Sequence, residues 1–242
     1  MPLQAVETRR LYRQIADQLR KGIASGEFAP GTRLPPERDL ATQLSVSRPS
    51  VREALIALEV EGLVEVRMGS GVYVTGAAPR AATAQGMDAA LGPFDIIRAR
   101  QLVEAELASV AARQRTPATL KQLRAAIKAM EDDIARGVMP IRGDREFHLA
   151  LAHASDNAAL VRVVTELFDE RNNPLFEQLG RHFENAKSWR AAVAEHRAVL
   201  RAVSEGDAAA ARRAMREHLQ RSHDRFAAAR IDDDTTERRR AA

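Results

Sequence analysis

The 242-residue chain contains no cysteine, so it cannot form disulfides, use a thiolate nucleophile or bind zinc in a cysteine-rich site. Any metal site must therefore be built from histidines and carboxylates. The chain also lacks a run of about 20 apolar residues that could cross a bilayer. Its N-terminus, MPLQAVETRRLYRQ, lacks the apolar core of a secretory signal. These absences predict a cytoplasmic protein.

The composition that remains is typical of a soluble globular protein, with 45% apolar and 29% charged residues. A length of 242 residues favours two domains over one. The net charge of +4 permits a polyanionic partner, but residues 1–76 hold ten basic and nine acidic residues. A DNA site in that region must therefore come from the local placement of arginines.

The first part of the chain has the pattern of a helix-turn-helix. Residues 9–25 carry apolar side chains at spacings of four, which predicts an amphipathic helix that Gly26 ends. The four apolar positions are Leu11, Ile15, Leu19 and Ile23. A second short helix is expected to start near Pro36. After a tight turn, Ser47 is expected to cap a third helix that runs to Gly62.

The next segment, LVEVRMGSGVYVT, has two runs of β-forming residues around a glycine-containing turn, which predicts a small hairpin. Together with the three helices before it, this hairpin makes residues 1–76 a predicted winged helix-turn-helix domain. Residues 77–92 are small and have no clear period, which indicates a linker.

From residue 93 onward strand signals are absent, and residues 93–228 predict an all-helical bundle. Thr116-Pro117 opens one helix, Gly137 closes it, and Asp207 can cap the last one. The expected helices lie at 94–112, 117–136, 142–154, 157–179, 188–204 and 208–229. The tail, 229–242, is predicted to be disordered. The predicted fold class is therefore mainly α, with an N-terminal winged helix-turn-helix and a C-terminal all-α bundle.

Arginines gather where a recognition helix would meet DNA. Arg48 and Arg52 lie one turn apart on the third helix, near its N-terminal end, and Arg38 lies on the second. Arginine can donate two hydrogen bonds to the major-groove edge of guanine. Ser47 and Ser50 are expected to contact phosphates, and Arg67 to reach phosphate or the minor groove beside the glycines of the hairpin turn. The alternative is a solvated arginine face on a generic helical hairpin.

These residues carry a family resemblance. The segment PGTRLPPERDLATQLSVSRPSVREALIALEVEGLVEVRMGSGVYV resembles the N-terminal domain of GntR-family repressors over about residues 10–75. The resemblance implies that Arg38, Arg48, Arg52 and Gly69 touch double-stranded operator DNA.

A second group of residues suits a metal ion. Asp144 and His148 are four apart and leave the same face of a helix. His196 and His218 are equally far from residue 207, the turn of a predicted helical hairpin, so they are expected to lie opposite each other. One aspartate and three histidines on three helices suit Zn²⁺, Ni²⁺ or Mn²⁺. The alternative is that each is an ordinary core or surface residue, which we expect of His153, His182 and His223.

The second domain also resembles a known family. The segments FDIIRARQLVEAELASVAA and GDREFHLALAHASDN and the two later histidines resemble the FCD-type effector domain of the FadR subfamily of GntR regulators, over about residues 93–225. The resemblance implies that Asp144, His148, His196 and His218 hold a divalent metal, with zinc favoured over nickel or manganese. It further implies that Arg100 binds the carboxylate of a small effector and that Asn157 belongs to the same site. The segment RNNPLFEQL is similar to the hexuronate-responsive branch of this subfamily. This similarity favours a sugar acid as the effector.

The sequence thus predicts a homodimeric repressor of metabolic genes that binds a palindromic operator and is released by a small carboxylate. Two rival interpretations remain at this stage. A metal-dependent hydrolase or isomerase acting on sugar acids would use the same ligands. Alternatively, the metal could only stabilise the bundle, with no effector.

Overall fold

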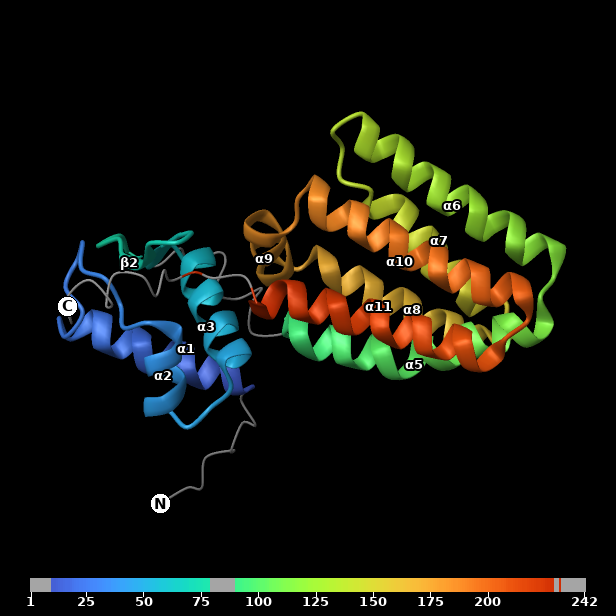
Figure 1. The fold of residues 1–242 in the computed structure, drawn as a ribbon. Helices are drawn as coiled ribbons and strands as arrows, with labels where there is room; N and C mark the ends of the chain where they lie inside the picture. The colour runs from blue at the N-terminus through green and yellow to red at the C-terminus, as the bar shows by residue number, and fades with distance from the viewer. Residues whose placement is uncertain (1–9, 79–89, 229–230, 232–242) are drawn as a thin grey trace, which may run out of the picture. The chain divides into compact units, whose positions relative to one another are not determined.

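A computed structural model of the chain describes residues 10–78, 90–228 and 231. The described residues up to Gly92 form one compact unit, and Pro93–Ala228 form a second. Helices dominate both units, and the one sheet of the described residues has two strands, which confirms the predicted fold class (Figure 1). Of the predicted linker, residues 79–89 lie outside the described part, as does the predicted disordered tail apart from Ile231. No helix of the described residues is long and apolar enough to span a membrane.

The first unit opens with three helices, α1 (Leu11–Ala24), α2 (Glu37–Gln43) and α3 (Arg48–Val60). Both α1 and α2 pack against α3. The turn between α2 and α3 contains Ser45 in the left-handed region, with φ 53°. Ser47 then caps α3, because its hydroxyl accepts a hydrogen bond from the Ser50 amide at 3.2 Å. The predicted helix-turn-helix and its cap are confirmed.

The buried face of α1 differs from the predicted stripe. Leu11, the first of the predicted apolar positions, is 48% exposed, whereas its neighbour Tyr12 is buried. Ile15, Ala16 and Leu19 are buried with it. A spacing of four exceeds the helical repeat of about 3.6, so a strict stripe drifts around the helix and leaves the core at its end.

A β-hairpin follows α3, formed by strands β1 (Val64–Arg67) and β2 (Gly71–Val74). The strands are antiparallel, with Val64 opposite Val74 and Arg67 opposite Gly71. Gly69 lies in the turn with φ 75°, a conformation that favours glycine. The predicted wing is confirmed, and its turn presents a glycine between two strands.

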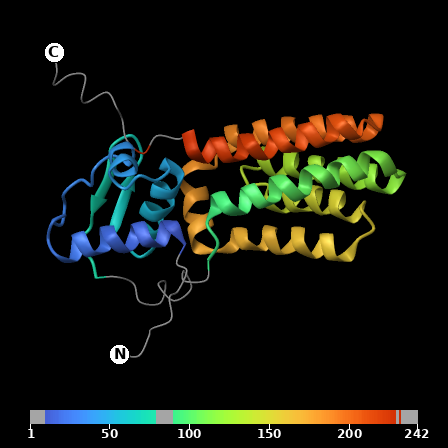
Figure 2. The same cartoon turned by 90° about the horizontal axis from the view of Figure 1, so that it is seen from below.

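The second unit is a bundle of seven α-helices. They are α5 (Pro93–Gln114), α6 (Pro117–Ala135), α7 (Ile141–His153), α8 (Ala158–Asp169), α9 (Pro174–Phe183), α10 (Ala186–Glu205) and α11 (Ala208–Ala228). Within this unit α5 runs beside α11 and α6 beside α7, while the short α9 lies across one end of the long helices (Figures 1 and 2). The core is rich in alanine around Met130, Phe147 and Met215, so the helices approach closely.

The expected single helix over 157–179 is wrong. Instead, α8 ends at Asp169, a short 3-10 turn η1 (Glu170–Asn172) follows, and α9 begins at Pro174. Asn173 caps α9 by accepting a hydrogen bond from the Phe176 amide at 2.8 Å. Because proline disfavours helical backbone in the residue before it, an Asn-Pro pair ends one helix and starts the next.

Candidate functional site

The first unit has an exposed arginine at the start of α3 and another on α2. The side chain of Arg48 is 53% exposed. That of Arg38, on α2, is 57% exposed and contacts Asp39. Ser47 is exposed and Ser50 is half-buried, and their hydroxyls lie 2.9 Å apart at the N-terminal end of α3. Hydroxyls and backbone amides at a helix N-terminus can donate hydrogen bonds to an anion such as phosphate.

Arg52 departs from the predicted DNA face. Its side chain is 1% exposed and forms a two-point ion pair with Glu37, with Nε–Oε1 at 2.7 Å and Nη2–Oε2 at 2.5 Å. The prediction that it shares an accessible face with Arg48 is therefore wrong. Sequence spacing placed the two arginines on one face, but α2 brings Glu37 against the inner edge of that face. Arg48 Nη2 lies 3.7 Å from the same carboxylate.

The wing presents Arg67 and Gly69. The Arg67 side chain is 54% exposed, pairs with Glu65 at 2.7 Å and lies over the Tyr73 ring at 4.5 Å from its centroid. A Cβ atom added at Gly69 would meet nothing within 4 Å among the described residues. The turn is thus open on the side where a nucleic-acid backbone could approach it closely.

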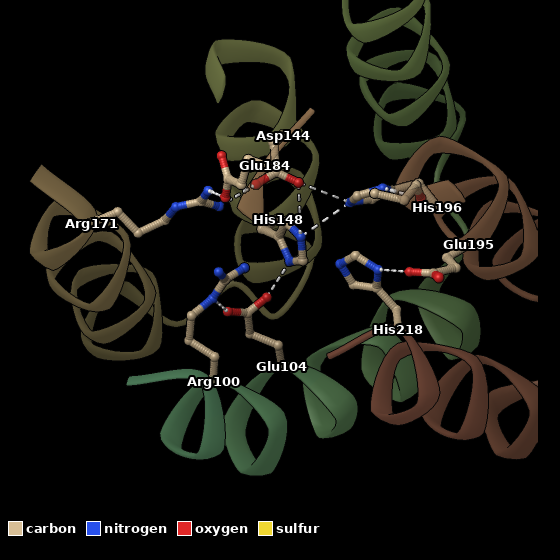
Figure 3. A network of polar contacts seen from close by, with 10 residues as sticks. Arg100, Glu104, Asp144, His148, Arg171, Glu184, Glu195, His196 and His218 are labelled. Atoms are coloured by element: carbon tan, nitrogen blue, oxygen red, sulfur yellow. Dashed lines mark hydrogen bonds and ion pairs between the residues drawn. The ribbon is translucent and has the colours of Figure 1, made fainter. Parts of the chain in front are cut away.

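The four predicted metal ligands come together inside the second unit (Figure 3). Asp144, His148, His196 and His218 are all buried, and each offers one ligand atom within 4.8 Å of the others. His196 Nε2 lies 3.1 Å from His148 Nε2 and 3.2 Å from Asp144 Oδ1. His148 Nε2 lies 3.6 Å from the same oxygen. The prediction that these residues meet across three helices, α7, α10 and α11, agrees with this geometry.

The other ring nitrogen of each histidine already has a partner. His148 Nδ1 contacts the Glu104 carboxylate, and His218 Nδ1 lies 2.8 Å from Glu195 Oε2. His196 Nδ1 lies 2.7 Å from the carbonyl oxygen of Ala192. A proton on each Nδ1 satisfies these acceptors and leaves Nε2 with a lone pair toward the cluster centre. Such outer partners fix the orientation of metal-binding histidines.

Burial and neighbouring charge set the protonation of the cluster. Burial lowers the pKa of His196, and burial together with the other two histidines holds the pKa of His218 well below its usual value. Both rings are therefore neutral and able to bind a cation. For His148, burial is outweighed by the Glu104 charge, which raises its pKa.

The two carboxylates of the cluster are held in their charged form. Burial alone would raise the pKa of Glu104, but the charges of Arg100 and His148 hold it at about 2. Burial is likewise outweighed for Asp144, whose pKa lies well below its usual value because His148 and His196 bond to it. A buried carboxylate that stays ionised needs cations around it, which a metal ion would supply.

The donor set fits a divalent ion. Metal–nitrogen and metal–oxygen bonds of roughly 2.1 Å place neighbouring ligand atoms about 3.0–3.5 Å apart. The separations of 3.1 and 3.2 Å fall in this range, and 3.6 Å lies just outside it. Three imidazoles with one carboxylate suit ions of intermediate softness rather than Ca²⁺ or Mg²⁺.

A cavity opens beside this cluster. Arg100, on α5, lines it and is only 3% exposed. Its Nε donates to Glu104 Oε1 at 2.6 Å, and its guanidinium stacks at 4.0 Å from the Phe168 ring centroid. Its Nη2 is buried and has no hydrogen-bond partner in the described part of the chain. An unpaired buried donor costs roughly 1–3 kcal/mol, so a ligand that accepts from it gains this energy.

Several residues around the cluster have no role in the sequence-based prediction. Arg171, on η1, donates from Nη1 to Asp144 Oδ2 and from Nη2 to Glu184 Oε1, both at 2.9 Å. Glu195 Oε2 lies 2.8 Å from His218 Nδ1, and Glu195 Oε1 accepts a hydrogen bond from Arg225 Nη1, also at 2.8 Å. The one sequence feature that could have indicated a role for Glu195 is its position directly before His196. Nothing in the spacing indicated Arg171, because the break before α9 brings it back to the cluster.

Asn157 does not join this site. Its Oδ1 accepts hydrogen bonds from the amides of Ala159 and Leu160 at 3.0 and 3.2 Å, so it caps α8. The residue is exposed, and it is absent from the described residues that line the cavity. The prediction that Asn157 binds the effector is wrong, because an asparagine before a helix was already required as a cap.

Both units match known families. Residues 11–74 match the family of bacterial regulatory proteins, gntR family, and residues 95–221 match the FCD domain. The chain belongs to the GntR family. This GntR regulator is 37% identical over 225 residues to the Uxu operon transcriptional regulator of Escherichia coli K12, covering 89% of this chain and 86% of that one. It is 38% identical over 227 residues to the Exu regulon transcriptional regulator of the same strain, covering 90% and 85%.

One solved structure shares the fold across the whole length. Lar, described as controlling expression of the Listeria monocytogenes agr system, aligns with a TM-score of 0.50 and 19% identity over 91% of this chain and 98% of that chain. Relatives matched along nearly their full length are transcriptional regulators, so this GntR-family chain is a DNA-binding regulator of transcription. The hydrolase or isomerase interpretation is set aside on the same ground.

Proposed function

We propose that the chain represses metabolic genes by binding a palindromic operator as a homodimer, and that a small carboxylate bound beside a divalent metal releases it. The observation that carries this proposal is the buried, unpaired Nη2 of Arg100 in a cavity next to the Asp144 cluster. A carboxylate placed there would accept from the guanidinium and could also reach the metal. Effector binding would then favour a domain arrangement that no longer fits both half-sites.

The metal would be held by Asp144, His148, His196 and His218, with zinc favoured over nickel or manganese. When bound, the ion supplies positive charge and open coordination positions for the effector. Support comes from the convergence of three Nε2 atoms and one carboxylate oxygen, and from the Nδ1 partners that orient each ring.

Operator contacts are proposed for the exposed residues of the first unit. Arg48 would read base edges from the start of α3, and Ser47 and Ser50 would bind phosphate. Arg38 would add a contact from α2. On the wing, the accessible Arg67 and the open turn at Gly69 suit phosphate or the minor groove. Arg52 would act indirectly, by fixing α2 against α3 through Glu37.

A sugar acid is proposed as the effector. Two relatives regulate, by name, the Uxu operon and the Exu regulon, and the sequence was already similar to a hexuronate-responsive branch.

Dimerisation is proposed through the helical unit. Leu102 on α5 is 70% exposed and Val163 on α8 is 39% exposed, on two helices that pack against each other. A contiguous exposed apolar patch marks an interface between subunits, and these two side chains are proposed to belong to one such patch.

The proposal can be tested in two steps. Sequencing of genomic DNA fragments captured by the purified protein gives an operator, and binding to that operator is then measured with D-galacturonate, with and without a chelator. The proposal expects release by the acid only while the metal is present. A metal that merely stabilises the bundle would instead give a lower melting temperature on chelation with an unchanged response to the acid.

A further inference from the structure

Two cavities of the helical unit share a wall. The first is the cavity beside the metal cluster, and the second is a groove formed by α9, η1 and the residues at the start of α7. Arg171 and Glu184 line both, and they are the two residues common to the two linings. A solute that crosses from the groove into the cavity must therefore pass these two side chains.

The cavity beside the cluster is nearly closed. Its volume of about 30 Å³ gives room for about two water molecules. The groove is larger, at about 380 Å³, and it is open toward solvent on its outer side. All four proposed metal ligands are buried, so the ion also needs a path to them. Part of the wall of the cavity must therefore move before a metal ion or a small acid can enter.

The shared wall is closed by ion pairs of Arg171. Its Nη1 donates to Asp144 Oδ2 and its Nη2 to Glu184 Oε1, both at 2.9 Å (Figure 3). The side chains of Arg171 and Glu184 are 12% and 15% exposed, so both reach solvent. When this pair opens toward the groove, water can take the place of each partner, which lowers the cost of opening. A change of side-chain rotamer is enough to break the contact.

The backbone around α9 also favours movement of these two side chains over movement of the helix. Arg171 belongs to the three-residue turn η1, and Glu184 follows the last residue of α9 with extended backbone, at φ −89° and ψ 131°. In contrast, α9 is anchored by four large buried apolar side chains, Leu175, Phe176, Leu179 and Phe183. Displacing α9 would expose these side chains to water, whereas turning Arg171 and Glu184 outward exposes charged groups, which water solvates well.

Building on the proposed function, we propose that Arg171 and Glu184 form a gate, and that the divalent cation and the small acid enter the cavity from the groove when this ion pair opens. Asp144 turns Oδ1 toward His196 and Oδ2 toward Arg171, so the gate can close while Oδ1 binds a metal. The gate sets the rates of binding and release, whereas the groups inside the cavity set the affinity.

The first test fills the groove without changing the cavity. Gly180 lies on α9 in the groove lining, and a Cβ atom added there would be 3.6 Å from Glu184 Oε2. A leucine would occupy the space into which Glu184 turns, and it also suits a helix better than glycine does. Gly180→Leu should slow uptake and release at least fivefold and leave the dissociation constants within twofold of wild type. Ala198→Leu is the matched control, because Ala198 is exposed on α10 and absent from both described linings.

The rates are measured on the full chain with two probes. Zinc release is followed with a chromogenic chelator. Binding of D-galacturonate to the zinc-loaded protein is followed by stopped-flow fluorescence of Trp189, which is the single tryptophan of the chain and lines the cavity. Binding of both probes with wild-type rates in Gly180→Leu would overturn the gate alone. Failure of both probes to bind wild type would overturn the proposed function and the gate with it.

The second test weakens the closed gate. Glu184→Gln keeps the shape of the side chain but removes the charge that holds Arg171 Nη2, so zinc uptake and zinc release should both accelerate at least fivefold. Glu131→Gln is the matched control, because it removes the partner of Arg197 from an ion pair on the outer side of α6 and should leave both rates unchanged. Faster release with unchanged uptake in Glu184→Gln would indicate weaker zinc binding alone and would contradict the gate.

Discussion

The ion pair between Arg52 and Glu37 gives two arginines of one helix different tasks. Both partners of the pair are almost fully buried, at 1% and 2% exposure, whereas Arg48 is 53% exposed. Removing one partner of such a pair leaves a buried charge without compensation. Arg52 therefore stabilises the helix-turn-helix, while Arg48 remains available to DNA.

Substitution of each arginine by alanine separates these tasks. Arg52→Ala should lower the free energy of unfolding by about 3–5 kcal/mol, because it removes the two-point ion pair of the buried Glu37 carboxylate and leaves the longer contact with Arg48 at 3.7 Å. Arg48→Ala should leave unfolding within about 0.5 kcal/mol of wild type but weaken operator binding and reduce base preference. Thermal denaturation and DNA-binding assays with operator and scrambled DNA check both. Normal stability of Arg52→Ala would show that the pair does not hold the two helices.

The metal cluster depends on its outer partners as well as its ligands. His196→Ala should lose the ion, and Glu104→Gln should weaken zinc binding about 10–100-fold because Glu104 orients His148 and supplies negative charge. Zinc content after dialysis, measured by mass spectrometry, and competition with a chromogenic chelator check this. The exposed His153 provides the control, since His153→Ala should retain full stoichiometry. Retention of zinc by His196→Ala would remove His196 from the ligand set.

Individual elements reach their positions through close contacts that the sequence only partly reveals. The sequence predicts three helix caps, because a short polar side chain precedes each of the three helices. The structure has all three caps, at Ser47, Thr116 and Asp207. The convergence of the histidines was readable because a helical hairpin brings equally spaced residues together. Residue spacing does not predict how distant elements pack. For this reason Arg52 was predicted to contact DNA although it is buried against α2, and no role was predicted for Arg171.

At Gly143, α7 lies close against α6. A Cβ atom added there would lie 2.7 Å from Met130 Cγ and 2.9 Å from the Ala126 carbonyl oxygen. Gly143→Ala should push α7 away and displace the adjacent Asp144, so zinc affinity should fall at least tenfold and the melting temperature should drop. In the control Gly180→Ala, the new Cβ would be 3.6 Å from the nearest atom, so stability should be kept or slightly raised. Unchanged zinc affinity in Gly143→Ala would contradict the tight contact.

At the scale of the whole molecule, a regulator of a palindromic site needs two copies of its DNA-binding domain. Leu102→Glu combined with Val163→Glu should give a monomer in sedimentation experiments, because two charges would be buried at the proposed interface. Operator affinity should fall with it. Val138→Glu changes another exposed apolar residue, at 54% exposure, and should remain dimeric. A double variant that still sediments as a dimer would place the interface elsewhere.

In the proposed function, the metal cavity of the helical unit controls DNA binding by the winged unit. The most direct test of this control is the affinity of a labelled operator fragment, measured by fluorescence anisotropy for zinc-loaded wild type and His196→Ala during titration with D-galacturonate. We expect the acid to weaken operator binding by wild type at least tenfold, and we expect His196→Ala to bind the operator without responding to the acid. A variant that responds to the acid as wild type does would contradict this expectation.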